Sequence, residues 1–327
     1  MKYSIISTLG PSSQTDSIWE AMLDGGVTGF RLNTSHMTVD ELLQQLKVLE
    51  MFFSDRQSFF PVVLDLQGSK WRLGRFSPFE LRQGQKIDFV HSDSAENKAT
   101  LPVPHPDFFK AARRSSGEII LNDARNSLAV DEIEPNRIRA TIVQGGKIYP
   151  NKGITYSKSD YRHESPGDKD LHIIERVEKF HFVQFAVSYI RDHLEMRKYR
   201  DVIGPSAVII AKLERQSAID DAMRIAYHSD ALWLCRGDLG AELGLRKMAI
   251  SIYDFSKRIA KIPRPVLLAG QVLHHMTTSS DPTRSEIVHL YDALVRGYAG
   301  LVLSDETAIG HDPVKSCRYA ALFRTDG

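Results

Sequence analysis

The chain has 327 residues, of which 42% are hydrophobic, and a formal net charge of +1 from 42 basic and 41 acidic residues. This length suits one large domain or two smaller ones. The nearly neutral charge gives no indication of a nucleic-acid or membrane partner. The apolar run at the N-terminus is too short for a signal peptide, and no stretch approaches the length of a membrane span. The two cysteines make no disulfide framework, so we expect a reducing cytoplasm as the setting.

The N-terminal part of the chain alternates strands with helices. Apolar runs bounded by turn signals predict three strands, over residues 3–8, 27–32 and 59–64. Helices are predicted between them, over residues 16–23 and from the capping box of Thr38 and Glu41 onward. Short alternating segments separated by Gly and Pro then predict a β-rich insertion over residues 75–150.

The alternation resumes after the insertion. Five more strands are predicted, over residues 182–188, 208–214, 232–238, 266–269 and 301–304. Helical spacing lies around them, over residues 168–179, 194–199, 217–227, 247–259, 283–295 and 313–323. Eight strands alternating with helices predict a (β/α)8 TIM barrel rather than an open sheet. Residues 1–74 and 151–327 would form this barrel, with residues 75–150 as a small β-rich lid domain inserted after the third strand.

Two of the predicted strands end in charged residues. One ends with Lys212 and Glu214, whose spacing of two places both side chains on the same side of the strand, and the other ends with Asp238. The carboxyl ends of parallel strands are where α/β proteins carry their chemistry. For either run alone, a structural ion pair or an ordinary turn is an equally good explanation. Further polar residues follow the other strands: Arg31, Asn33, Ser35, His36, Asp65, Lys70, Arg72, Ser304 and Glu306. Their clustering favours an active site.

The chemistry of this cluster suits a metal ion and an anion together. Glu214 and Asp238 can hold Mg²⁺ or Mn²⁺, because these hard cations prefer oxygen ligands and leave positions for substrate oxygens. Surrounding lysines and arginines suit phosphoryl transfer from a phosphorylated carboxylic acid, which needs charge neutralisation and alignment. The sequence has no Walker-type phosphate loop, dinucleotide fingerprint, zinc-protease motif or serine elbow. The adjacent His274 and His275 are more typical of a helix cap than of metal ligands.

Seven motifs of this chain resemble those of the pyruvate kinase family, in the family's order and on the expected strands. They lie at residues 5–12, 30–36, 64–74, 210–214, 235–240, 281–286 and 303–310. The resemblance covers nearly the whole chain. It implies a barrel with a small β domain after the third strand. It also implies a cytoplasmic, glycolytic phosphotransferase acting between phosphoenolpyruvate and a nucleoside diphosphate.

The resemblance also implies roles for individual residues. Lys212 and Arg31 would neutralise the phosphoryl group, and Glu214 and Asp238 would bind the divalent cation. The substrate would contact Lys212, Arg31, Ser188 and the backbone N–H groups of Gly237 and Asp238. The nucleotide, ADP or ATP, would lie near Pro11, His36, Arg72, Lys152 and the lid residue Asp123. The family's monovalent-cation site would correspond to Asn33, Ser35, Asp65 and Lys70. The ammonium of Lys70 would supply the charge of the bound ion, so we expect no K⁺ requirement.

Three departures from the family pattern affect these expectations. Gly270 stands where the family has a threonine associated with the transferred phosphate and with protonating the enolate, so its absence predicts weaker proton delivery. Asp305 replaces a glycine and adds negative charge. The family's C-terminal domain, which carries effector binding and much of the tetramer contact, has no counterpart in this sequence. We therefore expect a short, effector-independent form, for which a homodimer through barrel helices stays open.

Two other function classes fit the same residues. One is metal-dependent enolate chemistry on a 2-oxo acid, such as decarboxylation or aldol cleavage, because a metal and Lys212 stabilise an enolate whether or not phosphate leaves. The other is a ligand-binding protein that has kept the barrel and lost turnover. A kinase or phosphatase acting on another enol phosphate lies between these classes. Fold alone does not choose among them.

Overall fold

The computed structural model describes residues 1–112, 117–122, 125–156 and 166–325. The chain forms two compact units. The first, here called the barrel unit, comprises Met1–Gly68, Pro166–Arg236 and Ile250–Gly327, and the second, the insertion unit, comprises Ser69–Ser165 and Gly237–Ala249. The domain boundaries expected near residues 74 and 150 stay a prediction from the sequence. Among the described residues, no helix is both long and apolar enough to cross a membrane.

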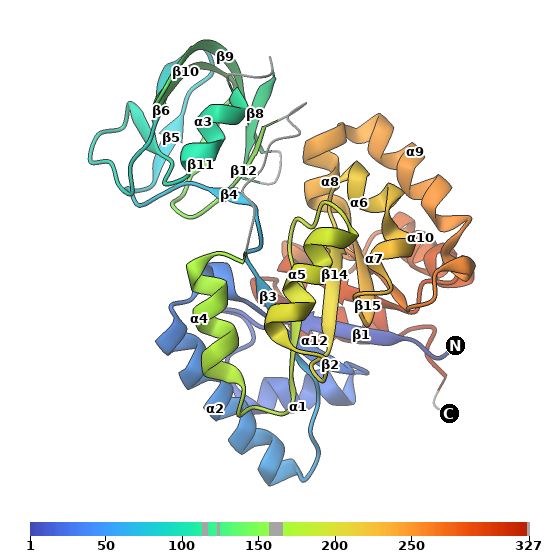
Figure 1. The fold of residues 1–327 in the computed structure, drawn as a ribbon. Helices are drawn as coiled ribbons and strands as arrows, with labels where there is room; N and C mark the ends of the chain where they lie inside the picture. The colour runs from blue at the N-terminus through green and yellow to red at the C-terminus, as the bar shows by residue number, and fades with distance from the viewer. Residues whose placement is uncertain (113–116, 123–124, 157–165, 326–327) are drawn as a thin grey trace. The chain divides into compact units, whose positions relative to one another are not determined.

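The barrel unit contains a closed ring of eight parallel strands (Figure 1). In chain order these are β1 (Ser4–Thr8), β2 (Gly29–Asn33), β3 (Val62–Leu66), β13 (Val183–Val187), β14 (Ile209–Leu213), β15 (Ala231–Cys235), β16 (Val266–Ala269) and β17 (Gly300–Leu303). Each strand pairs with the next along the chain, and β17 closes the ring by pairing with β1 in the register Ser4 to Gly300. The predicted (β/α)8 barrel is therefore confirmed.

The apolar runs become strands because both of their faces are covered. Side chains that point inward fill the barrel with a packed core, formed by Ile6, Val63, Ala186, Ile210, Trp233, Cys235, Leu267, Ala269 and Val302. Outward side chains are buried under the helices, so β3 and β14 have no exposed residue. A continuous apolar run, rather than an alternating one, is the pattern that such a strand requires.

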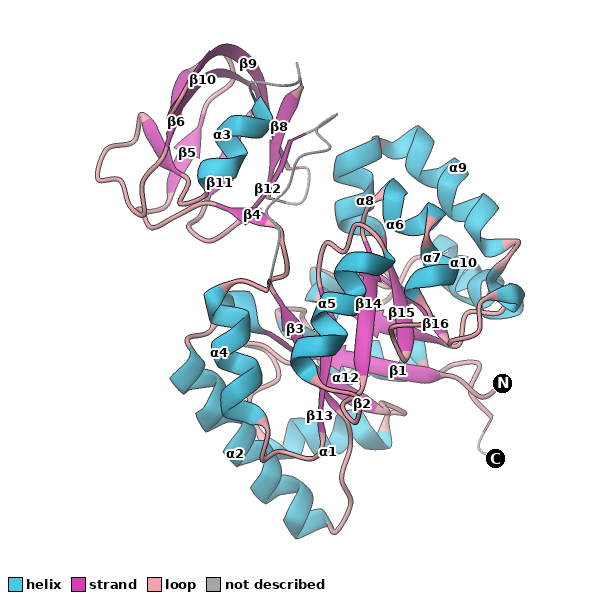
Figure 2. Cartoon of the chain, viewed as in Figure 1, coloured by secondary structure: helices cyan, strands magenta, loops and turns pink. Residues whose placement is uncertain are grey.

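Helices alternate with these strands (Figure 2). They are α1 (Asp16–Asp24), α2 (Val39–Arg56), α4 (Asp168–Val177), α5 (His193–Ile203), α6 (Gln216–Asp220), α7 (Ala222–Ile225), α8 (Arg236–Leu243), α9 (Leu245–Ser256), α10 (Arg284–Val295), α11 (Asp305–Ala308) and α12 (Pro313–Ala320). The predicted capping box is present, because the Thr38 side chain accepts from Glu41 N and the Glu41 carboxylate accepts from Thr38 N. Short 3-10 helices are η1 (Thr34–His36), η2 (Ile259–Lys261) and η3 (His274–Thr277).

Several sequence-based boundaries were wrong, and in two places the type or number of elements changed. The helix expected over residues 217–227 divides at Asp221 into α6 and α7. The strand expected over residues 232–238 ends at Cys235, and Asp238 lies in the first turn of α8 instead. The Arg-Gly-Asp sequence after Cys235 gives no apolar side chain to continue a buried strand.

The insertion unit is β-rich, as predicted. Seven strands form a sheet in the order β4 (Trp71–Arg72), β12 (Gly153–Tyr156), β8 (Glu118–Leu121), β9 (Asn126–Glu134), β10 (Arg137–Gln144), β6 (Lys86–Val90) and β7 (Thr100–Pro102). A second sheet pairs β5 (Phe79–Leu81) with β11 (Gly146–Ile148). The unit also contains α3 (Pro106–Ala112), which the sequence reading missed. Its Phe108 and Phe109 are fully buried, and the Phe108 ring meets Trp71 edge-on at 5.4 Å.

Candidate active site

Asp65 lies at the centre of a polar cluster in the barrel unit. It belongs to β3, and its side chain is 3% exposed. Lys212 Nζ lies 3.0 Å from each of its carboxylate oxygens, and Arg31 Nε donates to its Oδ2 at 2.8 Å. Ser188 Oγ donates to its Oδ1 at 2.9 Å. Side chains from β2, β3 and β14, and from the residue after β13, therefore meet at one carboxylate.

The charges in this cluster hold each other in the ionised state. Burial opposes ionisation of Asp65, but the neighbouring Lys212 and Arg31 outweigh it and hold the pKa of that carboxyl well below its usual range. Burial likewise opposes the charge of Lys212, yet Asp65 and Glu214 raise the pKa of its ammonium above the ordinary lysine value. Lys212 is thus a fixed cation rather than a proton donor at neutral pH.

Lys212 also contacts Glu214, which follows the end of β14. The Lys212 ammonium lies 2.9 Å from Glu214 Oε1 and donates to Ser188 Oγ at 2.9 Å. The other oxygen of Glu214 accepts the backbone N–H of Tyr189 at 2.7 Å, and Tyr189 has a left-handed backbone with φ of 63°. Lys212 and Glu214 do meet, as their spacing of two suggested, and one ammonium is shared by two carboxylates and a hydroxyl.

Thr8 is a member of this cluster that the sequence reading did not find. Its hydroxyl accepts from Arg31 Nη1 at 2.8 Å and donates to the carbonyl of Leu303 at 2.6 Å. The guanidinium of Arg31 is therefore fixed on two sides, by Asp65 and by Thr8. The sequence gives little signal for this residue, because Ser4 and Ser7 of the same strand are polar too and Thr8 does not stand out among them.

The residues expected at a monovalent-cation site are divided between the two units. Asn33 ends β2, and its side-chain oxygen accepts from Ser35 N at 3.2 Å to cap η1. Thr34 between them donates its hydroxyl to the carbonyl of Asp65 at 2.7 Å. Asn33, Ser35 and Asp65 are thus linked through neighbouring residues of the barrel unit. Lys70, the fourth member expected, lies in the insertion unit.

In the insertion unit, Lys70 pairs with Asp238 through its ammonium and Asp238 Oδ1. The Lys70 side chain packs closely on Gly153, where an added Cβ would lie 2.3 Å from Lys70 Cε and would displace the end of the lysine side chain. Gly237 precedes Asp238 in the first turn of α8. This ion pair gives the expected metal ligand Asp238 a fixed cationic neighbour.

The residues expected to contact nucleotide are distributed over both units. Arg72 Nη1 donates to the carbonyl of Asn151 at 3.1 Å, and the carbonyl of Lys152 accepts from Leu73 N at 2.9 Å. Pro11 lies in a turn after β1, and His36 ends η1. Asp123 lies outside the described residues. Their assignment to a nucleotide stays a prediction.

The loop after β16 is held by a residue that sequence reasoning did not assign. Gly270 and Gln271 both have left-handed backbones, with φ of 82° and 56°. Their two carbonyls accept from Nε and Nη2 of Arg236, each at 2.8 Å. No local sequence signal linked Arg236 to this loop, because the contact joins the ends of two neighbouring strands.

Glu306 is buried and binds backbone N–H groups instead of facing solvent. Its carboxylate is fully buried and accepts the backbone N–H groups of Leu273 at 3.2 Å and Ser304 at 3.0 Å. Burial raises the pKa of this carboxyl above its ordinary value. His274 and His275 lie in η3, and His275 N donates to Glu286 at 2.8 Å. Nowhere in the described residues do three His, Cys, Asp or Glu side chains gather closely enough to hold a metal ion.

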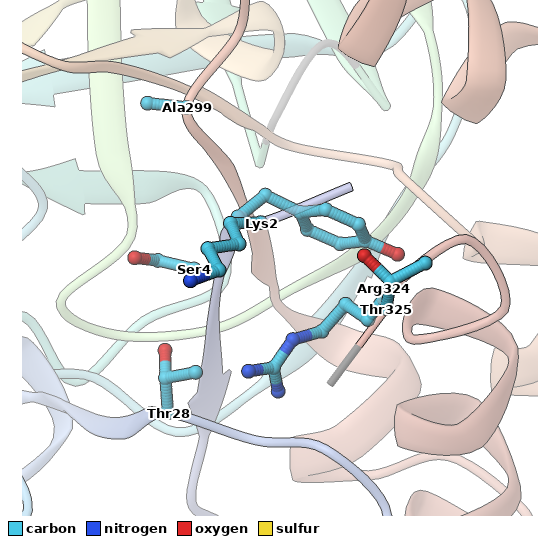
Figure 3. A pocket seen from close by; sticks show the side chains of 7 residues that line it. Lys2, Ser4, Thr28, Ala299, Arg324 and Thr325 are labelled. Atoms are coloured by element: carbon cyan, nitrogen blue, oxygen red, sulfur yellow. The ribbon is translucent and has the colours of Figure 1, made fainter. Parts of the chain in front are cut away.

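A pocket of about 620 Å³ lies at the opposite ends of the strands (Figure 3). The polar side chains of Lys2, Ser4, Thr28 and Arg324 line it. It lies at the amino ends of β1, β2 and β17. Active sites of (β/α)8 barrels lie at the carboxyl ends of the strands, so the cluster around Asp65 and Lys212 is the better candidate.

Comparisons with known proteins agree on one family. The family model described as pyruvate kinase, barrel domain, matches residues 1–317. A pyruvate kinase of Thermococcus litoralis is 29% identical over 325 residues, which cover 98% of this chain and 68% of that protein. One of Aeropyrum pernix is 31% identical over 331 residues, with coverages of 97% and 69%. A crystal structure of a pyruvate kinase from Cryptosporidium parvum superposes with a TM-score of 0.84 at 25% identity, over 98% of this chain and 68% of that one. The chain thus spans about two thirds of the length of these proteins.

Proposed function

Because the chain belongs to the pyruvate kinase family, we propose that it transfers a phosphoryl group between phosphoenolpyruvate and a nucleoside diphosphate. In this reaction the bond from phosphorus to the enol oxygen breaks, a bond to a terminal oxygen of the diphosphate forms, and the enolate takes up a proton to give pyruvate. The observation that carries the proposal is Lys212. Its buried ammonium is fixed among Asp65, Glu214 and Ser188 at the carboxyl end of a barrel strand.

The cationic side chains would neutralise charge on the phosphoryl group. Lys212 and Arg31 both contact Asp65, so each is oriented before substrate binds and needs little reorganisation during the reaction. The Thr8 hydroxyl limits rotation of the Arg31 guanidinium. The backbone N–H groups of Gly237 and Asp238, in the first turn of α8, are the proposed contacts of the substrate carboxylate, with Ser188 as a further substrate contact.

Mg²⁺ or Mn²⁺ is the proposed cofactor, with Glu214 and Asp238 as its protein ligands. Both side chains offer carboxylate oxygens, the donors that such an ion prefers, which supports the proposal. When bound, the ion would stabilise negative charge on the phosphoryl and enol oxygens. ADP or ATP is the proposed co-substrate, near Pro11, His36, Arg72 and Lys152.

The primary test measures pyruvate formation from phosphoenolpyruvate and ADP with Mg²⁺ and without K⁺. We expect turnover that requires ADP and that disappears when the divalent cation is chelated. Decay of a 2-oxo acid without nucleotide would instead support metal-dependent enolate chemistry, which the missing hydroxyl at Gly270 favours as the second candidate. Binding of phosphoenolpyruvate without any product would leave a ligand-binding protein.

Replacing Gly270 with threonine is expected to destabilise the protein without raising turnover. The backbone φ of 82° at this position is left-handed, a region that costs a residue with a Cβ about 1–2 kcal/mol and is worst for β-branched side chains. The free energy of unfolding should therefore fall in Gly270→Thr, and kcat should fall as well because the strain would displace the turn after β16.

Gly204→Thr is the matched control for Gly270→Thr. Gly204 has φ of 94°, has open space around an added Cβ, and follows α5 at the amino side of β14. We expect this control to lose similar stability and to keep kcat. A rise in kcat for Gly270→Thr would show that the position accepts a hydroxyl and that glycine alone limits turnover.

A further inference from the structure

Three hydrogen bonds of one guanidinium join the ends of β15 and β16 to α10. Arg236 follows β15 directly, and its Nε and Nη2 donate to the carbonyls of Gly270 and Gln271, each at 2.8 Å. Its third donor, Nη1, lies 2.7 Å from Nε2 of His289 on α10. Each of the three guanidinium nitrogens therefore has an acceptor, two successive carbonyls and one imidazole, all within the barrel unit.

The turn that Arg236 binds is conformationally unfavourable by itself. Gly270 and Gln271 are consecutive left-handed residues, and a left-handed backbone at a residue such as Gln271 costs about 1–2 kcal/mol. Such a turn persists only when surrounding contacts hold it. A planar guanidinium suits this task because two of its N–H groups reach adjacent carbonyls at once, which the single ammonium of a lysine does not reproduce.

His289 is the acceptor that completes this arrangement. A guanidinium only donates, so Nε2 of His289 has to accept, and the ring is neutral with its proton on Nδ1. Burial and the charge of Arg236 lower the pKa of His289 below its ordinary value. Asp292 acts in the other direction, but it is paired with Arg296 at 2.6 Å. The groups that face Arg236 itself are Tyr298, Glu306 and Glu286.

We propose that Arg236 is a positioning residue that fixes the Gly270–Gln271 turn, and that His289 makes the contact between Arg236 and this turn dependent on pH. Protonation of His289 would remove the acceptor and place a second cation beside Nη1. Arg236 would then withdraw from the turn. The catalytic consequence rests on the proposed function, in which this turn follows a barrel strand at the face where the enolate would be protonated.

The folded protein favours the neutral form of His289, and this preference sets the direction of the pH effect. The contribution of this contact to stability is fully present above the ordinary pKa of histidine. It is lost as pH falls through the lowered pKa of the folded protein. Activity should show the same acid loss, because the position of the turn depends on the same proton.

The first experiment tests the contact between Arg236 and His289 without an assay of activity. Protein labelled with ¹⁵N in its histidines is titrated by NMR from about pH 8 to about pH 5, a window that brackets the usual histidine pKa of about 6.5. His289→Gln identifies the resonances of His289 by their loss. We expect the Nδ1-protonated neutral form with a lowered pKa, and a shift toward the ordinary pKa in Arg236→Met, which removes the neighbouring charge. A proton on Nε2 at about pH 8, or an ordinary pKa in the wild type, would overturn the proposal even if the chain makes no pyruvate.

The second experiment separates positioning from general stability. Arg236→Met is expected to lower kcat about 100-fold with a smaller change in KM, as for misplacement of a catalytic element by about 1 Å. Arg236→Lys should recover part of this loss. His289→Gln keeps an acceptor that does not titrate, so it should retain the wild-type kcat at about pH 8 and lose less activity at about pH 5.

Arg200→Met is the matched control. Arg200 likewise binds backbone carbonyls, those of Gly204 at 3.2 Å and Ala207 at 2.7 Å, and pairs with Asp230 at 2.6 Å. These contacts lie before β14 and β15, at the amino ends of the strands. We expect this variant to lose stability and keep kcat. Equal losses of kcat in Arg200→Met and Arg236→Met would reduce Arg236 to a structural residue.

Discussion

Replacing Lys212 with methionine is expected to lower pyruvate formation by about 10³-fold or more, as measured with saturating phosphoenolpyruvate, ADP and Mg²⁺. Methionine keeps the length of the side chain and removes its charge. Lys212 is 8% exposed and its ammonium contacts Asp65, Glu214 and Ser188, so the substitution removes a buried cation that these groups fix in position. The effect should fall on kcat, because the charge that Lys212 neutralises develops on the transferred group.

The same substitution should also reduce stability. Removing the ammonium leaves the Asp65 and Glu214 carboxylates, 3% and 2% exposed, with less positive charge beside them. Breaking a buried ion pair from one side typically costs about 3–5 kcal/mol, and Arg31 at Asp65 offsets part of this cost. Denaturant unfolding of Lys212→Met measures the loss. In the double variant Lys212→Met with Asp65→Asn, we expect part of the stability to return and the activity to stay lost.

Lys257→Met is the control for charge removal alone. Lys257 pairs with Asp254 on α9, and both side chains are more than half exposed, so its loss should leave activity and stability almost unchanged. Retention of substantial turnover in Lys212→Met would contradict the proposed role of this ammonium. So would recovery of activity in the double variant, because activity would then follow stability rather than charge.

The barrel could be predicted from the sequence because its strands carry a strong and local signal. Runs such as residues 208–214 are apolar on both faces, and the helices between them have amphipathic spacing and readable caps such as Thr38 with Glu41. Eight repeats of this pattern leave few alternatives. Boundaries were less predictable where the apolar pattern stopped before the chain changed direction, as at Cys235, after which α8 begins immediately.

The candidate site could be predicted only as a set of strand-end residues, without their contacts. The sequence indicated Lys212 and Glu214 because their spacing is local. It gave no reason to place Asp65 between Lys212 and Arg31, since that contact depends on which strands of the closed barrel are neighbours and on the stagger between them. Arg236 was missed for a similar reason. Its acceptors are backbone carbonyls in a left-handed turn, and no side chain in the sequence indicates that turn.

Replacing Lys70 with glutamate is expected to convert a K⁺-independent protein into one that needs K⁺. The Lys70 ammonium pairs with Asp238, which is the proposed metal ligand, and its side chain is 8% exposed. A carboxylate at this position would replace attraction by repulsion, so activity without K⁺ should fall by about 100-fold or more. About 0.1 M K⁺ should restore a large part of it, whereas tetramethylammonium at the same ionic strength should not, because its methyl groups keep carboxylate oxygens farther from the charge.

The wild type tests the same assignment from the other side. We expect its pyruvate formation to be unaffected by K⁺, since Lys70 already supplies a permanent positive charge beside Asp238. Lys70→Met should lose activity and recover less with K⁺ than Lys70→Glu, because it removes the ammonium without adding an anionic partner for the ion. Lys257→Glu, at an exposed position directly after α9, should show neither effect. Two outcomes would contradict the assignment of Lys70 to the monovalent-cation site: a wild type that is active only with K⁺, and a Lys70→Glu variant whose activity does not depend on K⁺. The ion pair of Lys70 with Asp238 would then be a structural contact.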